Sequence, residues 1–224
     1  MRKLTFLLLL LASIYCNAQQ GAKNQNFRIA VNAGFSQLLA KTSNSVPAQS
    51  KNYVSALKSG ANYGIDASYF ISKEWGFGMK FNQFKSSNSG TYYDSNLGST
   101  VSMADHITHT FIGPSAATRY VSPNNKHGLV FTLALGYLGY LNDGALNGTS
   151  FKIKGGTFGS ALDAGYDYHV NKRFALGVQA SVVGGVLKSY TVTYANTTQK
   201  IELDEKSKES LSRIDFSFGA RFNF

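Results

Sequence analysis

Four residues near the middle of the chain have the side-chain types of a hydrolytic active site. Ser102, Asp105, His106 and His109 supply a nucleophile, an acid and two possible bases close together in the sequence. On a helix, the two histidines at a spacing of three could instead bind a metal ion. A triad is defined by geometry and not by closeness along the chain, so a solvated polar loop is the interpretation we favour. We therefore predict no enzyme activity, no metal and no cofactor.

Nine ionisable residues form a second candidate set, on the polar face of segments whose other face is apolar. The nine are Arg28, Asp66, Lys80, Arg119, Asp163, Asp167, Arg213, Asp215 and Arg221. Five are basic and four are acidic, so their charges nearly balance. Charges that share a narrow interior are costly unless they are paired. We expect a network of ion pairs that plugs this interior, and the alternative is a narrow solvated path or a small-molecule site.

The elements that would position these residues are eight segments in which apolar and polar residues alternate. They span residues 26–36, 60–71, 75–85, 108–121, 128–141, 156–170, 173–190 and 214–224. The last is the clearest, because Phe216, Phe218 and Phe222 share one face while Asp215 and Arg221 share the other. A period of two is that of a β-strand, so the sequence predicts an all-β protein.

The connections between these segments alternate between short and long. Three are short (72–74, 122–127 and 171–172), and four are long (37–59, 86–107, 142–155 and 191–210). This order predicts an eight-stranded antiparallel up-and-down transmembrane β-barrel, whose short turns lie at one end and long loops at the other. A soluble lipocalin-like barrel is the alternative, but its solvent face would here be unusually rich in Gly and small residues. A short helix or extended strand tips are expected within 191–210.

Aromatic residues gather at the two ends of the expected strands. Near the short turns are Tyr69, Trp75, Tyr120, Tyr168, Phe174 and Phe222. Near the long loops are Phe35, Phe84, Tyr137, Tyr140 and Tyr190. Such grouping predicts two aromatic girdles at the two interfaces of a membrane.

The start of the chain has the pattern of an export signal. Arg2 and Lys3 precede an apolar run that ends near Ile14 and is too short to span a bilayer as a helix. We predict a signal peptide at residues 1–18 and a single barrel domain at 19–224.

Cys16 is the only cysteine of the chain. A lipoprotein signal that modifies Cys16 is the alternative to cleavage after Ala18, but the preceding Tyr15 is large where that signal has a small residue. Cleavage after Ala18 would leave the mature protein without cysteine, which excludes disulfides and thiol catalysis.

The amino-acid composition narrows the fold classes and partners that the chain can have. The chain has 22 Gly, 3 Pro, 13 Tyr and 16 Phe, a mixture that suits many strands and fits a helical bundle poorly. The mean hydropathy of −0.14 does not argue against a barrel, because half of each strand faces inward. The net charge is +10, but Lys and Arg are spread over the whole sequence, so no nucleic-acid partner is expected.

Pro114 stands inside the fourth segment, where it cannot donate a ladder hydrogen bond. Because a closed barrel has no edge strand, we expect a bulge or kink at this position. The alternative is a lateral opening for an apolar ligand.

The pattern also resembles a known family. The signal ending at Asn17-Ala18, the eight segments, the stretch Ile112-Gly113-Pro114 with Arg119-Tyr120, and the closing Phe222-Asn223-Phe224 are similar to the porin-like, eight-stranded OmpA/OmpX-type outer-membrane β-barrels of Gram-negative bacteria. The resemblance implies an integral, monomeric protein of the cell outer membrane, in contact with its lipid and lipopolysaccharide. It also implies that Phe218, Phe222 and Phe224 are the signal read by the barrel assembly machinery.

This family is functionally mixed, so the resemblance implies location and fold more than activity. We expect a structural or surface-interaction protein. One alternative is a narrow channel or carrier for small or hydrophobic molecules, and a second is an outer-membrane enzyme acting on lipid or peptide. Lys41, Lys51 and Lys58 make the first long connection basic, which would suit lipopolysaccharide phosphates.

Overall fold

A computed structural model describes residues 26–40, 50–94, 98–195, 197–204 and 208–224. The signal peptide predicted at 1–18 lies outside the described residues, as does Lys41. Within the described ranges, no helix is long and apolar enough to cross a bilayer.

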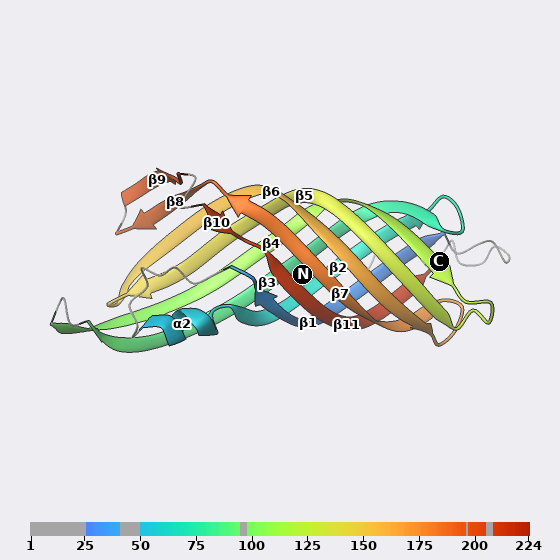
Figure 1. The fold of residues 1–224 in the computed structure, drawn as a ribbon, viewed down its shortest axis with the longest axis horizontal. Helices are drawn as coiled ribbons and strands as arrows, with labels where there is room; N and C mark the ends of the chain where they lie inside the picture. Colours follow the sequence, from blue (N-terminus) through green and yellow to red (C-terminus); the bar gives the residue numbers. More distant parts are fainter. Residues whose placement is uncertain (1–25, 41–49, 95–97, 196, 205–207) are drawn as a thin grey trace, which may run out of the picture.

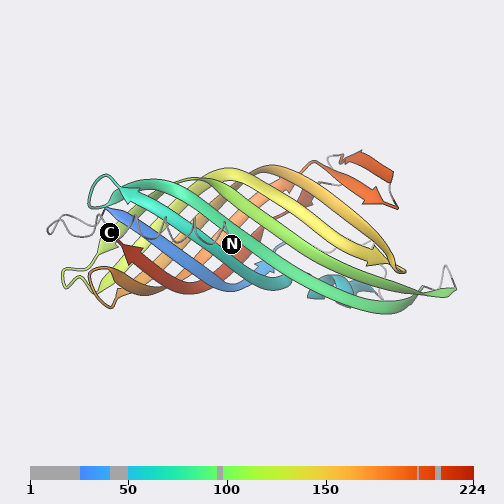
Figure 2. The same cartoon turned by 180° about the vertical axis from the view of Figure 1, so that it is seen from behind.

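Eight antiparallel strands close into a barrel (Figures 1 and 2). They are β1 (Phe27–Leu38), β2 (Ser59–Phe70), β3 (Trp75–Asp94), β4 (Ser99–Val121), β5 (His127–Leu146), β6 (Thr149–His169), β7 (Phe174–Leu187) and β11 (Arg213–Asn223). Each pairs with the next along the chain, β7 pairs with β11, and β11 pairs with β1. The predicted eight-stranded up-and-down barrel is confirmed.

The two ends of the chain complete the ring. The backbone N–H of Phe224 donates to the carbonyl of Phe27 at 2.8 Å, and the N–H of Phe27 donates to the carbonyl of Phe224 at 3.1 Å. Their rings lie 6.3 Å apart, centroid to centroid. The terminal residue is therefore part of the closure between β11 and β1.

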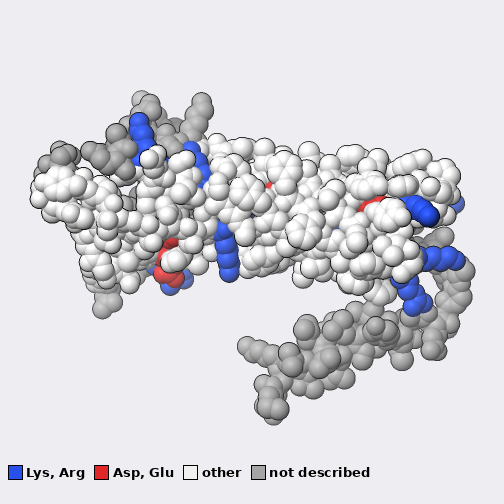
Figure 3. All heavy atoms as spheres, turned by 90° about the horizontal axis from the view of Figure 1, so that it is seen from below, with Lys and Arg blue, Asp and Glu red and all other residues white. Residues whose placement is uncertain are grey.

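The outer surface of the barrel is apolar. Phe216, Phe218 and Leu162 are 58–69% exposed, whereas alternate residues of the same strands are buried inside. Figure 3 shows a broad zone of this surface, between the two ends of the molecule, that is almost free of charged side chains. A large exposed apolar band of this kind is typical of contact with lipid, so the barrel is transmembrane.

Four strands continue well beyond the lengths expected from the sequence. β3 and β4 occupy most of the predicted loop 86–107, and β5 and β6 occupy most of 142–155. The prediction of long loops was wrong here, because these strand ends leave the lipid and no longer need an apolar face. Without that face their Ser, Thr and Asn residues looked like a loop.

The remaining elements also lie at this end of the barrel, which we call the long-loop end. They are α2 (Lys51–Ala56), β8 (Ser189–Tyr194), β9 (Thr197–Glu202) and β10 (Glu209–Ser210). β8 pairs with β6, and β8 and β9 form a hairpin, which confirms the strand tips expected within 191–210. The opposite end, which holds the three tight turns and Phe224, is the short-turn end (Figure 1).

No bulge forms at Pro114. The register of β4 against β3 and against β5 is the same on both sides of this residue, although Gly113 and Pro114 have no partners on β5. A β-carbon at Gly113 or Gly136 would lie 2.1 Å from a carbonyl oxygen of the neighbouring strand. The two glycines let the backbones come close where Pro114 removes a donor, so the strand accommodates proline without an extra residue.

Gly219 on β11 allows a similar close approach to β1, and its replacement gives a test of the fold. A β-carbon there would lie 1.8 Å from the Val31 carbonyl oxygen, so Gly219→Ala should reduce the free energy of unfolding by roughly 1–3 kcal/mol. At Gly165 the nearest atom would be 3.6 Å away, so Gly165→Ala should be tolerated. Urea unfolding in lipid vesicles measures both, and equal stability of the two variants would contradict the packing described.

Candidate functional site

The structure turns all nine ionisable candidates toward the inside of the barrel. Eight are buried, and Arg119 is half-buried. They divide along the barrel axis into three clusters, which we call inner, middle and outer in order from the short-turn end.

The inner cluster consists of Arg28, Asp167 and Arg221. Arg28 donates from Nε and Nη2 to Asp167 Oδ2, at 3.1 and 2.7 Å. Arg221 Nε donates to Asp167 Oδ1 at 2.8 Å. Arg119 lies nearby at the short-turn end, with its guanidinium 3.8 Å from the centre of the Phe70 ring and its Nε bonded to the Lys73 carbonyl at 3.0 Å. One carboxylate thus serves two buried guanidinium groups.

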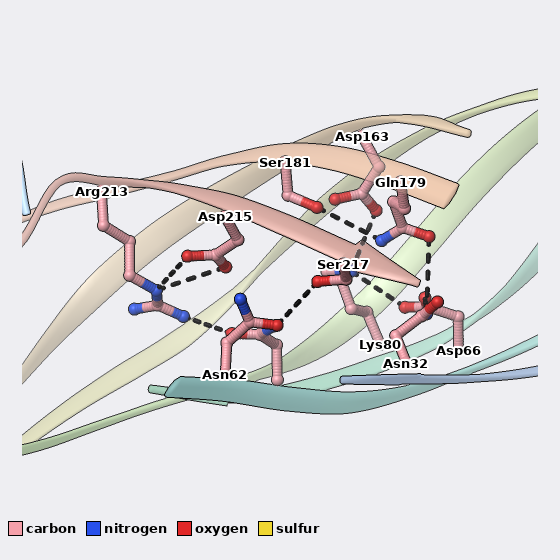
Figure 4. A network of polar contacts seen from close by, with 11 residues as sticks. Asn32, Asn62, Asp66, Lys80, Asp163, Gln179, Ser181, Arg213, Asp215 and Ser217 are labelled. Carbon is pink, nitrogen blue, oxygen red and sulfur yellow. Dashed lines mark hydrogen bonds and ion pairs between the residues drawn. The ribbon is translucent and has the colours of Figure 1, made fainter. Parts of the chain in front are cut away.

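The middle cluster is centred on Lys80 (Figure 4). Its Nζ lies 3.0 Å from Asp66 Oδ1 and 3.0 Å from Asp163 Oδ2. Asn32 Nδ2 donates to Asp66 Oδ2 at 3.2 Å and connects this group to Gln179. Here one ammonium group serves two carboxylates, the reverse of the inner cluster.

The outer cluster pairs two neighbours on β11. Arg213 Nε donates to Asp215 Oδ1 at 3.1 Å (Figure 4). Arg213 Nη2 also donates to Asn82 Oδ1. Both members of the pair are fully buried. Ser217 Oγ, further along β11, donates to Asn62 Oδ1 at 2.7 Å and ties β11 to β2 across the lumen.

An apolar plug, which we did not predict, fills the lumen beside and beyond the outer cluster. Its members are Phe111, Ala134, Leu138, Ala161, Val183, Leu187 and Leu211, each at most 2% exposed. One signal in the sequence could have revealed it. The run 128–141 is apolar at nearly every position, which indicates a strand buried on one face and in lipid on the other.

The structure also corrects part of the prediction that two aromatic girdles face the membrane interfaces. Phe35 and Tyr137 face outward as predicted, at 52% and 55% exposure. Phe84 is fully buried in the lumen, and Tyr140 and Tyr190 are partly buried and pack against the plug. The prediction for these three was wrong, because nearness to a strand end does not determine which face a residue occupies.

The four residues of the suggested hydrolytic site are not brought together. They lie on strand β4, where Ser102 and His106 face outward while Asp105 and His109 face inward. His109 packs between the rings of Phe84 and Tyr140, with centroid distances of 5.4 Å to each. The histidines are not on a helix, and the described residues contain no group of three His, Cys, Asp or Glu that could hold a metal ion. This stretch forms neither a triad nor a metal site.

Asp105 instead anchors the short helix of the first long connection. Tyr53 on α2 donates its hydroxyl to Asp105 Oδ2 at 2.7 Å, and Asn142 Nδ2 donates to Asp105 Oδ1 at 2.5 Å. Asn88 Nδ2 also donates to the Tyr53 carbonyl at 3.0 Å. Burial, followed by the bond to Asp105, raises the pKa of the Tyr53 hydroxyl above its ordinary value, so this donor stays protonated.

Removing the Tyr53 hydroxyl should loosen α2 without disturbing the barrel. Tyr53→Phe loses one net hydrogen bond to a charged acceptor, worth about 1.5–3 kcal/mol. Hydrogen exchange of the amides of residues 51–56 should therefore speed up by roughly tenfold or more. Tyr93→Phe, on the exposed end of β3, should leave the rates unchanged. Equal rates in both variants would show that this bond does not hold the helix.

Comparison with known proteins supports the fold. No protein-family model matches the chain, and no curated protein matches it. Among solved structures, the outer-membrane protein OprG of Pseudomonas aeruginosa is 12% identical, with a TM-score of 0.54, over 90% of this chain and 99% of OprG. A major outer-membrane protein of Thermus thermophilus is also 12% identical, with a TM-score of 0.54, over 89% of this chain and 98% of that one. These similarities show a shared outer-membrane β-barrel fold and do not extend to an activity.

Proposed function

Because the chain has the fold of an outer-membrane β-barrel, we propose that it is an integral outer-membrane protein with a closed lumen and an exposed interaction surface. The short-turn end would face the periplasm, and the long-loop end would face outward. The filled lumen is the observation that carries this proposal.

The contents of the lumen argue against a steady aqueous pore. An eight-stranded barrel has an interior that side chains just fill, whereas aqueous porins use roughly sixteen to eighteen strands. Here the three charge clusters occupy the lumen from the short-turn end as far as Arg213, and the plug fills the space beside and beyond the outer cluster, against β5 and β7. The paired charges cross-link strands that are not neighbours, such as β3 with β6 through Lys80 and Asp163. The bonds stabilise a closed barrel rather than line an open path.

The extended strands supply the interaction surface. β2 pairs with β3 only as far as Lys85, so residues 86–94 have a partner strand on one side alone, apart from the contacts of α2. β9 is a second free edge, since it pairs only with β8 among the described strands. Strand edges can pair with an extended segment of another protein, which favours a surface-interaction role.

Ion conduction separates this proposal from the channel alternative. The unmodified protein, reconstituted in planar bilayers, should show no large, steady conductance. Phe111→Ala, which removes the one aromatic ring among the plug residues, should admit a small intermittent leak. Large and stable conductance from the unmodified protein would support a channel and contradict a closed lumen. Lipid or peptide turnover by the purified protein would instead support the enzyme alternative.

A further inference from the structure

The inner cluster holds buried hydrogen-bond donors that lack acceptors. Arg221 is fully buried, and neither its Nη1 nor its Nη2 bonds to any described residue. Asn223 is 4% exposed, and its Nδ2 likewise has no partner in the described ranges. The two residues are two positions apart on the inward face of β11, roughly 7 Å along the strand. Asn223 stands directly opposite Arg28 in the ladder with β1.

The same place has an excess of positive charge. Arg28 and Arg221 share the single carboxylate of Asp167, so these three residues together carry one net positive charge, and Asp66 of the middle cluster is the next carboxylate that acts on Arg221. Arg28 lies near enough to Arg119 and Arg221 to repel both. The half-buried ring of His169 also faces this group. A buried charge without a partner is costly, and so is each buried donor without an acceptor.

We propose that the inner cluster binds a small inorganic anion at Arg221 and Asn223. An anion would accept from the Nη groups and from Nδ2, and it would also neutralise the surplus guanidinium charge. Water could supply acceptors but not charge. The site would be reached from the short-turn end, where Arg119 and His169 are only half-buried. This inference does not depend on whether the lumen conducts.

The middle cluster gives an internal contrast. The buried atoms without hydrogen-bond partners there include Asn32 Oδ1 and Asp163 Oδ1, which are acceptors. Two carboxylates surround one ammonium group, so the local charge is negative. Of these two clusters, the inner one is rich in donors and positive, and the middle one is rich in acceptors and negative, so only the inner one suits an anion. Arg213 Nη1 in the outer cluster is also a buried donor without a partner among the described residues, but the charge of Arg213 is matched by Asp215.

Bromide is the probe that tests this site. Crystals of the full barrel grown or soaked in sodium bromide should show an anomalous peak within hydrogen-bond distance of Arg221 Nη and Asn223 Nδ2. In detergent solution, bromide should raise the unfolding temperature by several degrees relative to gluconate at equal ionic strength, because a ligand that binds only the folded state stabilises it.

Two variants and a matched control make the solution test specific. Asn223→Ala and Arg221→Lys should lose most of the bromide-dependent shift. Asn32→Ala removes another buried asparagine, in the middle cluster, and this variant should keep the bromide-dependent shift. No shift in the unmodified protein, an equal shift in all variants, or ordered water alone at the site would overturn the proposal.

Discussion

Replacing Asp167 with alanine is expected to destabilise the barrel by roughly 3–5 kcal/mol, because it leaves two buried guanidinium groups unpaired. Both arginines bond to this one carboxylate, at 2.7 and 2.8 Å. Arg28 and Arg221 lie on β1 and β11, the strands that close the ring, so the loss should also weaken closure. Urea unfolding in lipid vesicles measures the change in the free energy of unfolding.

An exposed ion pair provides the control for Asp167→Ala. The carboxylate of Asp143 lies 3.1 Å from Lys152 Nζ, but both side chains are about half exposed. Asp143→Ala should therefore cost less than about 1 kcal/mol. Replacing Arg28, Asp167 and Arg221 together by Met, Leu and Met should recover much of the lost stability, because no unpaired charge remains. Equal costs for the two single alanine variants would show that the inner cluster is not desolvated.

Deleting Phe224 is the second change with a large expected effect. It removes two backbone hydrogen bonds to Phe27 and the ring contact between the ends of the chain. It also removes the terminal residue of the expected assembly signal, of which Phe218 and Phe222 face outward on β11. We expect the protein to accumulate as periplasmic aggregates that are degraded, with little reaching the outer membrane. Cell fractionation and immunoblotting measure the yield.

Two substitutions separate the role of the Phe224 ring in the assembly signal from its role in closing the barrel against Phe27. Phe224→Ala keeps the backbone bonds and loses the ring, and Phe27→Ala loses the same ring contact from the other strand. If the ring of Phe224 is part of the assembly signal, only Phe224→Ala should lower the yield strongly. If the two variants behave alike, the ring acts through closure. Normal yield after deletion of Phe224 would contradict both roles.

The strands inside the membrane could be predicted because a barrel strand in lipid alternates strictly, with apolar residues facing outward and polar or small residues facing inward. Each of the eight segments alternates, and the same register placed residues such as Asp66 and Arg213 on the inward face, where the structure has them. Beyond the membrane surface a strand no longer needs an apolar outer face. Residues 86–94 form a strand without an apolar face, so their sequence carried no period-two signal of hydrophobicity.

The contents of the lumen were harder to predict than its boundary. Which carboxylate meets which base depends on contacts across the barrel, such as Arg28 with Asp167 and Lys80 with Asp163. Separation in sequence says nothing about these pairs. The plug was missed because Leu138 stands in a run that is apolar on both faces, where alternation cannot distinguish lipid from core.

Chemical access to the middle of the lumen tests its closure most directly. Ser181 is 3% exposed and accepts a hydrogen bond from Gln179, between the inner cluster and the plug, whereas Ser89 is exposed at the end of β3. Cys16 is the only cysteine of the chain and lies in the segment predicted to be removed, so Ser181→Cys and Ser89→Cys would each carry a single thiol. A charged, membrane-impermeant maleimide should modify Ser89→Cys rapidly and leave Ser181→Cys largely unmodified in the folded barrel, although both should react after unfolding. Similar rates for the two folded variants would reveal a continuous water path and contradict the closed lumen.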